Sequence, residues 1–257
     1  MNRAYFNGLK AAANQAADFD PLQLFANGEN GAWYDQNDTS TLFQDLSATI
    51  PATSDGDPVR VMIDKSGNGN NMIAPSDDTR PLLAQAGGRF YLDMSGLKRM
   101  SATGFTGSGN ITPYYGGAKF EALTTGTQAY ISKASGTAVG GNDWSYLNVN
   151  NNGTVRIAGI QFPNAGDLVN QFTTPPVMVS ETKGFDGLAA FLLLNEQAEA
   201  TEDTGLNSTY QDGTIFLSSR NNGLIADMNF FGMVYVEKSS AVTTEEKDQL
   251  HNYIKSL

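Results

Sequence analysis

Short apolar segments separated by polar breaks run through most of the chain. Segments of this kind, bounded by Gly, Asn and Asp, are typical of the strands of a β-sandwich or barrel. The pattern predicts strands at residues 59–63, 89–92, 118–123, 128–132, 144–149, 154–160, 177–182, 188–194, 214–218 and 228–236. Residues 150–153 read Asn-Asn-Asn-Gly, which predicts a hairpin turn because Asn and Gly tolerate positive φ.

An N-terminal helix is predicted over residues 2–19. Apolar side chains recur there at helical spacing, and Asp20-Pro21 then ends the helix, since the residue before proline disfavours helical backbone angles. Its apolar side either packs on the chain's own domain or anchors the chain to a partner subunit. The candidate anchoring residues are Tyr5, Phe6, Leu9 and Phe19.

A second helix is predicted at the other end. Thr243 and Glu246 stand at the spacing of a capping box, in which each residue satisfies an amide of the other. Apolar residues then follow on one helical face. We therefore expect a helical extension over residues 1–21 and one β domain over residues 22–257.

Composition narrows the classes of function. The net charge of −11 and the pI near 4.4 argue against a nucleic-acid partner, because such proteins carry a basic patch. Without cysteine there are no disulfides, zinc–thiolate centres or cysteine nucleophiles, and a Ser-His-Asp triad would need the single histidine, His251. Apolar runs reach about seven residues, against about 20 for a membrane span. With no apolar signal core at the N-terminus, we expect synthesis in the cytoplasm and no membrane partner.

Two stretches resemble known families. The first is carried, in order, by residues 24–35, 40–45, 57–59, 63–70 and 80–81, and it resembles the opening of a domain that recurs in tailed-bacteriophage virion proteins. The second, residues 230–236 with 243–246, resembles the last strand and helix of concanavalin A-like, laminin-G-type jelly rolls. These resemblances imply an all-β fold, an antiparallel β-sandwich jelly roll, in a virion structural or adsorption protein.

The candidate metal ligands are Asp64, Asn68 and Asn70. In residues 64–70, oxygen-bearing side chains at alternate positions precede glycine, as at the start of a calcium loop. The closing carboxylate is missing, because Pro75 stands where an EF-hand needs Glu. The alternative is a tight turn in which Asp64 and Asn68 bond nearby backbone amides while Gly67 and Gly69 adopt positive φ. Calcium is the one cofactor that the sequence leaves open.

The candidate glycan-binding residues are Trp144, Tyr146, Tyr114 and Tyr115. An aromatic ring offers a sugar a flat apolar face and, for Tyr and Trp, a polar edge. Side chains alternate along a strand, so Trp144 and Tyr146 are expected to share one face opposite Ser145. The same rings turned inward would be core, an alternative that also applies to Trp33 and Tyr34.

The sequence offers no recognisable catalytic constellation. Glycoside hydrolysis needs two carboxylates about 5–10 Å apart, and the strand motif Glu-x-Asp-x-x-Glu of lectin-like glucanases is absent. His251 is interpreted as a surface or helix-packing residue. An acidic run is interpreted as a solvated loop; it comprises Glu196, Glu199, Glu202 and Asp203. We therefore expect a protein that is not an enzyme.

These observations predict a non-enzymatic structural component of a tailed-phage virion, on the capsid surface or the tail, that displays a lectin-like β-sandwich. The alternative is a glycan-binding adsorption protein, and a glycan hydrolase is the third hypothesis. Expected partners are other virion proteins, further copies of the chain and cell-surface glycans. The expected location is the virion.

Overall fold

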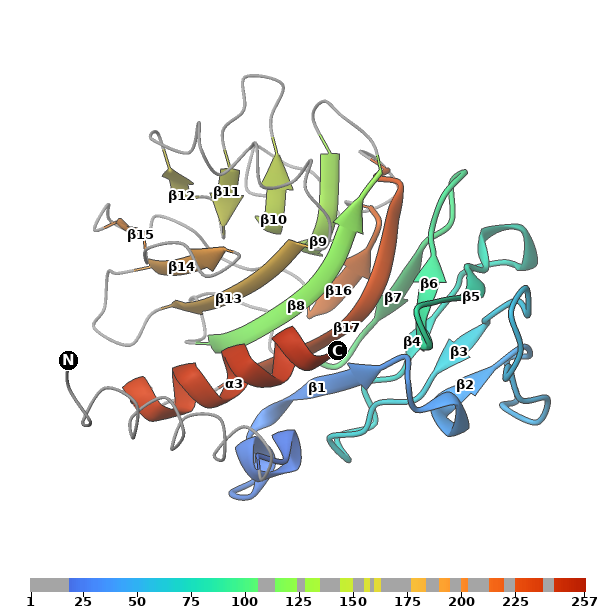
Figure 1. The fold of residues 1–257 in the computed structure, drawn as a ribbon, viewed down its shortest axis with the longest axis horizontal. Coiled ribbons are helices and arrows are strands. Elements are labelled where there is room, and N and C mark those ends of the chain that lie inside the picture. Colours follow the sequence, from blue (N-terminus) through green and yellow to red (C-terminus); the bar gives the residue numbers. More distant parts are fainter. Residues whose placement is uncertain are drawn as a thin grey trace, which may run out of the picture.

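The computed structural model describes residues 19–105, 114–123, 128–134, 144–149, 155–157, 160–162, 177–183, 190–194, 200–202, 213–219, 225–237 and 243–257. In these ranges the chain forms two antiparallel β-sheets and one α-helix, α3 (Thr244–Ser256) (Figure 1). The prediction of a mostly β chain that closes in a helix is confirmed. The predicted N-terminal helix, residues 2–19, falls almost wholly outside the described ranges.

Sheet A contains eight strands among the described residues. In order across the sheet they are β15 (Ala200–Glu202), β14 (Ala190–Leu194), β13 (Val177–Lys183), β8 (Tyr114–Ala122), β17 (Met228–Glu237), β6 (Arg89–Asp93) and β5 (Leu82–Ala86), with β1 (Asn30–Asp35) also paired to β17. Strand β8 lies along one edge of β17. Along the other edge, β6 pairs with the start of β17 and β1 with its end.

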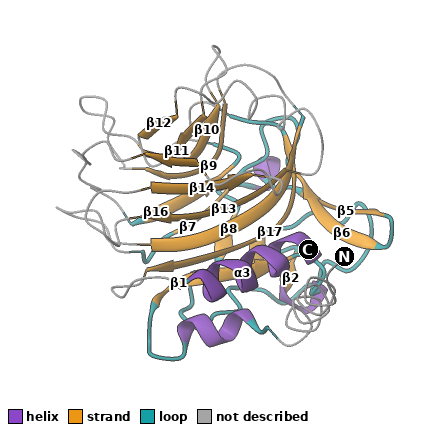
Figure 2. Ribbon diagram, turned by 60° about the vertical axis from the view of Figure 1, so that its left-hand side comes forward, coloured by secondary structure: helices purple, strands orange, loops and turns teal. Residues whose placement is uncertain are grey.

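Sheet B contains nine strands. They are β12 (Ile160–Phe162), β11 (Val155–Ile157), β10 (Trp144–Val149), β9 (Gln128–Ala134), β16 (Thr214–Leu217), β7 (Met100–Ala102), β4 (Met72–Ile73), β3 (Val61–Met62) and β2 (Leu42–Phe43). Three short 3-10 helices complete the described elements: η1 (Pro21–Phe25), η2 (Thr39–Thr41) and η3 (Asp77–Thr79). The two sheets stack face to face (Figure 2).

Each predicted strand coincides with an observed one, with two differences. The segment 154–160 is two strands, β11 and β12, paired antiparallel with each other. The acidic run is not wholly a loop, because Glu202 belongs to β15, which pairs with β14; Glu196, Glu199 and Asp203 lie outside the described residues. Residues 150–153, where the hairpin turn was predicted, lie outside the described residues; β10 and β11 on either side of them pair antiparallel.

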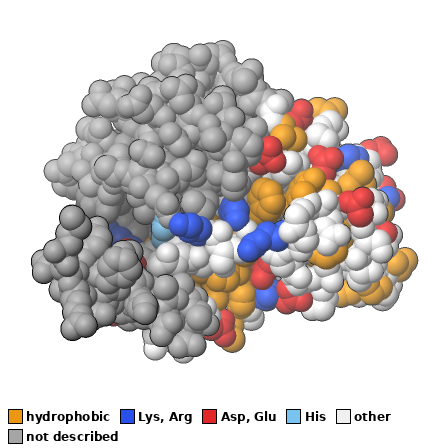
Figure 3. Space-filling view, viewed as in Figure 1, with side chains coloured by type: hydrophobic (Ala, Val, Ile, Leu, Met, Phe, Trp, Pro, Cys, Tyr) orange, Lys and Arg blue, Asp and Glu red, His pale blue; other side chains and the backbone are white. Residues whose placement is uncertain are grey.

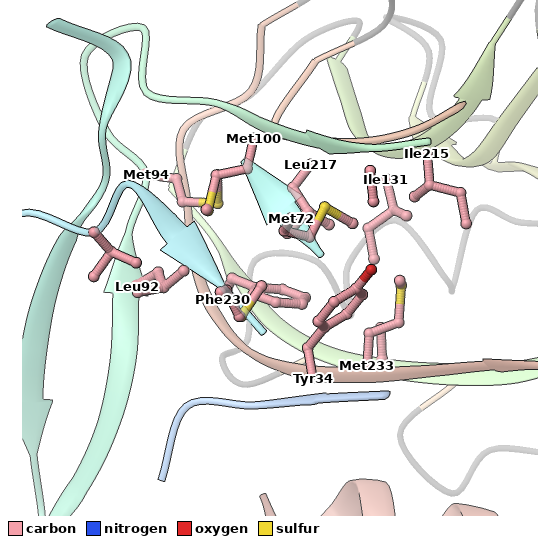
Figure 4. Close-up of a cluster of buried hydrophobic side chains, with 14 of the residues drawn as sticks. Tyr34, Met72, Leu92, Met94, Met100, Ile131, Ile215, Leu217, Phe230 and Met233 are labelled. Atoms are coloured by element: carbon pink, nitrogen blue, oxygen red, sulfur yellow. The ribbon is translucent and has the colours of Figure 1, made fainter. Parts of the chain in front are cut away.

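The main core lies between the two sheets and is rich in methionine. Six methionines are buried in it: Met62, Met72, Met94, Met100, Met228 and Met233. Figure 4 shows how side chains from both sheets meet, among them Phe230 and Met233 from sheet A and Ile131 and Leu217 from sheet B. Unbranched methionine fills irregular gaps between such rows. This packing fixes which face of each sheet is inner and which is outer.

A second core forms where α3 packs on the outer face of sheet A. Leu250 and Ile254 of the helix are fully buried together with Val234 and Val236 of β17. The predicted capping box is confirmed, because Thr243 Oγ1 accepts from the Glu246 amide (3.2 Å) and Glu246 Oε2 accepts from the Thr243 amide (2.8 Å). Among the described residues, no helix has the length and apolarity needed to cross a membrane.

Buried tyrosines make stability depend on alkaline pH. Burial is the main cause that raises the pKa of Tyr34, and the charge of Asp64 is the second. Burial also raises the pKa values of Tyr115, which lies beneath α3, and of Tyr253, which belongs to α3. The unfolded chain loses these protons near pH ~10 while the folded chain keeps them. Since the unfolded state then binds fewer protons, stability is fully present below that pH and falls above it, by up to about 1.4 kcal/mol per pH unit for each tyrosine.

Urea unfolding of the wild-type chain and of Tyr115→Phe at about pH 8, 10.5 and 11.5 checks this expectation. Lys119, whose pKa burial lowers, is present in both proteins, so its contribution to the slope cancels from the comparison. We expect the variant to lose less stability per pH unit than the wild type. Equal slopes would show that Tyr115 ionises alike in both states.

Candidate functional site

The loop that carries the predicted metal ligands is a hydrogen-bonded turn. Asp64 is 5 % exposed, and each of its carboxylate oxygens accepts two hydrogen bonds from protein donors. Oδ1 accepts from the amides of Trp33 and Ser66 (both 2.9 Å), and Oδ2 accepts from Ser66 Oγ (2.8 Å) and the Asn70 amide (3.1 Å). Four donors use the four acceptor positions of a carboxylate. The geometry is thus that of the predicted tight turn, with Gly67 and Gly69 at φ +88° and +77°.

The two asparagines of this turn tie it to the approach to β1. Asn70 Nδ2 donates to the Gly31 carbonyl (2.7 Å), and Asn68 Nδ2 donates to the carbonyls of Glu29 and Gly31 (3.0 and 3.2 Å). Asn68 therefore bonds carbonyls and not the nearby amides that the sequence suggested, because the turn folds against a neighbouring strand. Among the described residues, no group of three acidic, histidine or cysteine side chains stands ready to hold a metal ion.

Burial excludes Tyr115 from the predicted glycan-binding residues. It is 1 % exposed and its hydroxyl donates to the Glu246 carbonyl of α3, because its position in β8 points it to the face that the helix covers. The side chains of Tyr114, Trp144 and Tyr146 lie outside the described part. The backbone of β10, however, has a register shift at Tyr146, so the strict alternation expected for Trp144 and Tyr146 is interrupted by a bulge.

Trp33 and Tyr34 belong to the packing of β1. Tyr34 is fully buried and its hydroxyl donates to the Asn70 carbonyl. Trp33 lies beneath α3: its Nε1 donates to the Tyr253 hydroxyl (2.6 Å), and Lys65 Nζ lies 4.3 Å from its ring centroid. Lys65 in turn pairs with Asp38 (2.8 Å). These contacts occupy the Trp33 ring, so the core alternative holds for both residues.

Of the predicted anchoring residues, Phe19 alone is described. Its ring meets Tyr253 of α3 edge to face, with centroids 6.3 Å apart, so in this structure it packs on the chain's own helix. Tyr5, Phe6 and Leu9 lie outside the described residues. His251 lies in α3, as predicted for a helix residue.

The outer face of sheet A beside α3 presents two rows of side chains that the sequence analysis did not single out. Their members come from β6, β17 and β8, whose intervening residues point into the core. The first row runs from Asp93 through Asn229 to Glu121, which are paired directly across the three strands. The second row, two residues further along each strand, contains Tyr91, Phe231 and Lys119.

The two aromatic rings of this outer-face site are in contact. The centroids of Tyr91 and Phe231 are 5.4 Å apart, at an interplanar angle of 40°, and both side chains are half-buried. A bulge at Phe231 interrupts the pairing of β17 with β8, and bulges often re-aim side chains next to functional sites. Figure 3, drawn from the side on which α3 lies, shows hydrophobic side chains on this face beside acidic and basic ones.

Polar groups surround the aromatic pair. Asn229 Nδ2 donates to Glu121 Oε2 (2.8 Å), which holds the middle of the first row in place. Lys119 Nζ lies 5.6 Å from the Phe231 centroid and donates to the carbonyls of Lys255 and Leu257 at the end of α3. Burial lowers the pKa of Lys119, and the nearby Arg89 adds to the effect. The pKa of Tyr91 is raised, mainly by partial burial and then by the negative charges of Asp93, Glu121 and Asp55. Its hydroxyl therefore remains protonated and can donate a hydrogen bond.

Sequence reasoning missed this site because its members lie far apart along the chain. The strands 89–92, 118–123 and 228–236 were each predicted, and alternation assigns Tyr91 and Phe231 to a face opposite Leu92 and Phe230. What no single strand shows is that β6 and β8 flank β17. That adjacency alone brings Asp93 and Glu121 onto one face.

No protein-family model and no curated protein matches the chain. The fold does match solved structures. An arabinofuranosidase complexed with arabinofuranosyl-α-1,2-xylobiose has a TM-score of 0.61 at 15 % identity, over 92 % of this chain and 65 % of that one. Trypanosoma rangeli sialidase with the inhibitor DANA has a TM-score of 0.51 at 8 % identity, over 96 % and 38 %. The ligand binding domain of botulinum neurotoxin serotype D, in complex with N-acetylneuraminic acid, has a TM-score of 0.50 at 11 % identity, over 74 % and 47 %.

At such identities these likenesses show the fold, and the chain spans 65 % of the length of the arabinofuranosidase chain and less of the other two. They nevertheless correct the prediction that the chain is not an enzyme, because glycoside hydrolase chains share this fold. That prediction required two carboxylates on a single strand. Neighbouring strands can also bring two carboxylates together; Asp93 of β6 and Glu121 of β8 lie on either side of Asn229.

Proposed function

We propose that this chain is a glycan-binding domain and that its ligand lies on the outer face of sheet A, over Tyr91 and Phe231. The observation that carries the proposal is the contacting aromatic pair with the polar row Asp93–Asn229–Glu121 directly beside it. A sugar ring has an apolar face and a rim of hydroxyls, so it needs both kinds of surface side by side. The solved structures of similar fold, which contain sugar-acting and sugar-binding proteins, support this assignment.

In the proposed binding mode, the two rows of side chains contact different parts of the sugar. The rings of Tyr91 and Phe231 would pack against the apolar face of one sugar unit. The free acceptor positions of Asp93, Asn229 and Glu121 would take the hydroxyl protons, and hydrogen bonds to charged acceptors are the stronger ones. We assign the domain to the concanavalin A-like jelly rolls as part of this proposal, on the resemblance of residues 230–236 and 243–246.

Replacing Tyr91 by alanine tests the proposal. We expect at least about a tenfold loss of affinity for whichever oligosaccharide a glycan array identifies, because the central aromatic residues of an interface carry most of its binding energy. Tyr91→Phe, which keeps the ring, should lose less. Leu46→Ala is the matched control, since Leu46 is an exposed apolar residue (61 %) on a different part of the surface. Unchanged affinity in Tyr91→Ala, with the fold intact by circular dichroism, would contradict the proposed face.

Glycan hydrolysis is a second candidate function of the same face. The observation that favours it is the placement of Asp93 and Glu121 on one face of the sheet, on either side of Asn229. Two strand spacings put their backbones about 10 Å apart, and side chains that lean toward each other would reach the range of catalytic carboxylate pairs. Release of reducing ends from the array-identified glycan would reveal the activity, and Asp93→Asn and Glu121→Gln should each abolish it. Binding without any release would leave recognition as the function.

We further propose that the domain is carried on a tailed-phage virion, where it would meet cell-surface glycans alongside other virion proteins. This setting is supported by the sequence resemblance within residues 24–81. Antibody-gold labelling of intact virions tests it: label on the head indicates a capsid protein, label on the tail indicates adsorption machinery, and unlabelled particles would contradict a virion location.

A further inference from the structure

Resting on the proposed glycan-binding function, we infer that the outer face of sheet A selects uncharged glycans and rejects acidic ones. The class of ligand follows from which charges on this face are free to meet it. The chain as a whole has a net charge of −11, but a ligand over Tyr91 and Phe231 meets only the charged groups around these two rings.

The two carboxylates of the first row retain acceptor capacity. Among the described residues, each is held in place through one oxygen only: Asp93 Oδ1 accepts from the Ser95 amide (2.9 Å), and Glu121 Oε2 accepts from Asn229 Nδ2 (2.8 Å). The second oxygen of each carboxylate is left to accept hydrogen bonds from ligand hydroxyls.

The cations of this face do not balance these carboxylates. Lys119 is 8 % exposed, and its ammonium donates to the carbonyls of Lys255 and Leu257, so it stabilises the end of α3 and is not free for a ligand. Arg89 is exposed and lies two residues beyond Tyr91, on the side away from Asp93. On β6, β8 and β17, Arg89 is therefore the one exposed cation of the described face, and it stands against the two carboxylates of the first row, Asp93 and Glu121.

This arrangement favours a ligand that donates hydroxyl protons and carries no negative charge. A sugar carboxylate placed over the aromatic pair would approach Asp93 and Glu121 within the distance at which like charges repel, and partial desolvation strengthens that repulsion. Neutral sugars carry no charge that these carboxylates repel, and their hydroxyls can donate to the free acceptor positions. Arg89 could hold an acidic group only if the ligand lay at the edge of the site.

Matched glycan pairs test the selectivity with the full chain. The probes are a neutral oligosaccharide panel that includes lactose and xylotriose, together with sialyllactose and a glucuronic-acid-substituted xylotriose as acidic counterparts. We expect the neutral member of a bound pair to bind at least about tenfold more tightly at low ionic strength. Salt at about 0.5 M should narrow that ratio by screening the repulsion and leave the neutral affinity unchanged.

The double variant Asp93→Asn/Glu121→Gln should reduce the ratio to about threefold or less. Asp78→Asn/Glu245→Gln removes the same charge from exposed positions on η3 and α3 and should leave the ratio unchanged. If an acidic glycan bound as tightly as its neutral counterpart, the inferred selectivity would be wrong, whereas the proposed binding face would still hold. A panel without any bound member would remove the proposed function, and this inference with it.

Discussion

Replacing Asp64 by alanine is expected to lower the free energy of unfolding by about 3–5 kcal/mol. The carboxylate is buried and accepts hydrogen bonds from the amides of Trp33, Ser66 and Asn70. Alanine leaves these donors unsatisfied in a buried place, and an unpaired buried donor costs about 1–3 kcal/mol. Urea unfolding monitored by fluorescence measures the difference.

Asp45→Ala is the matched control for this experiment. Asp45 likewise accepts from two amides and a hydroxyl of its own turn, those of Thr49 and Ile50, but its turn is exposed, so water can replace the lost acceptor. We expect a clearly smaller loss of stability. If the two variants were equally destabilised, burial would not be the source of the Asp64 effect.

Replacing Gly31 by alanine is expected to destabilise the chain by about 3 kcal/mol or more, or to prevent folding. Gly31 has φ +153° at the start of β1, and a Cβ there would lie 2.1 Å from the Tyr235 carbonyl oxygen. The neighbour is backbone of the central strand β17, so it cannot move aside as a flexible side chain would. The soluble yield and the unfolding midpoint of the variant measure the effect.

The variant Gly28→Ala separates the backbone strain of a positive φ from the steric clash of the added Cβ. Gly28 has φ +81°, but a Cβ added there would have no neighbour within 4 Å, so this variant should show the backbone cost alone, about 1–2 kcal/mol. A Gly31 variant no worse than the Gly28 variant would mean that β1 can shift relative to β17. Such a shift would also loosen the turn around Asp64, because Asn70 bonds the Gly31 carbonyl.

The outer-face site shows where sequence reasoning reaches its limit. Aromatic residues at 114, 115, 144 and 146 were selected because they stand in pairs along the chain. Tyr91 and Phe231 are separated by 140 positions, and no local pattern joins them. The same limit explains the mistaken exclusion of an enzyme, since the search for paired carboxylates followed single strands.

The sequence by itself predicted ten strand segments and the closing helix with its Thr243–Glu246 capping box. Each of these depends on residues a few positions apart, and such contacts leave a periodic or positional signature in the chain. The strands β2, β4, β5 and β7 were not predicted, and the turn at residues 64–70 was one of two alternatives. Only the tertiary structure decided that α3 buries Tyr115 and Trp33, and that β17 lies between β6 and β8. These outcomes depend on which sheet face meets the helix and which strands become neighbours, and both follow from the packing of the whole core rather than from any local segment.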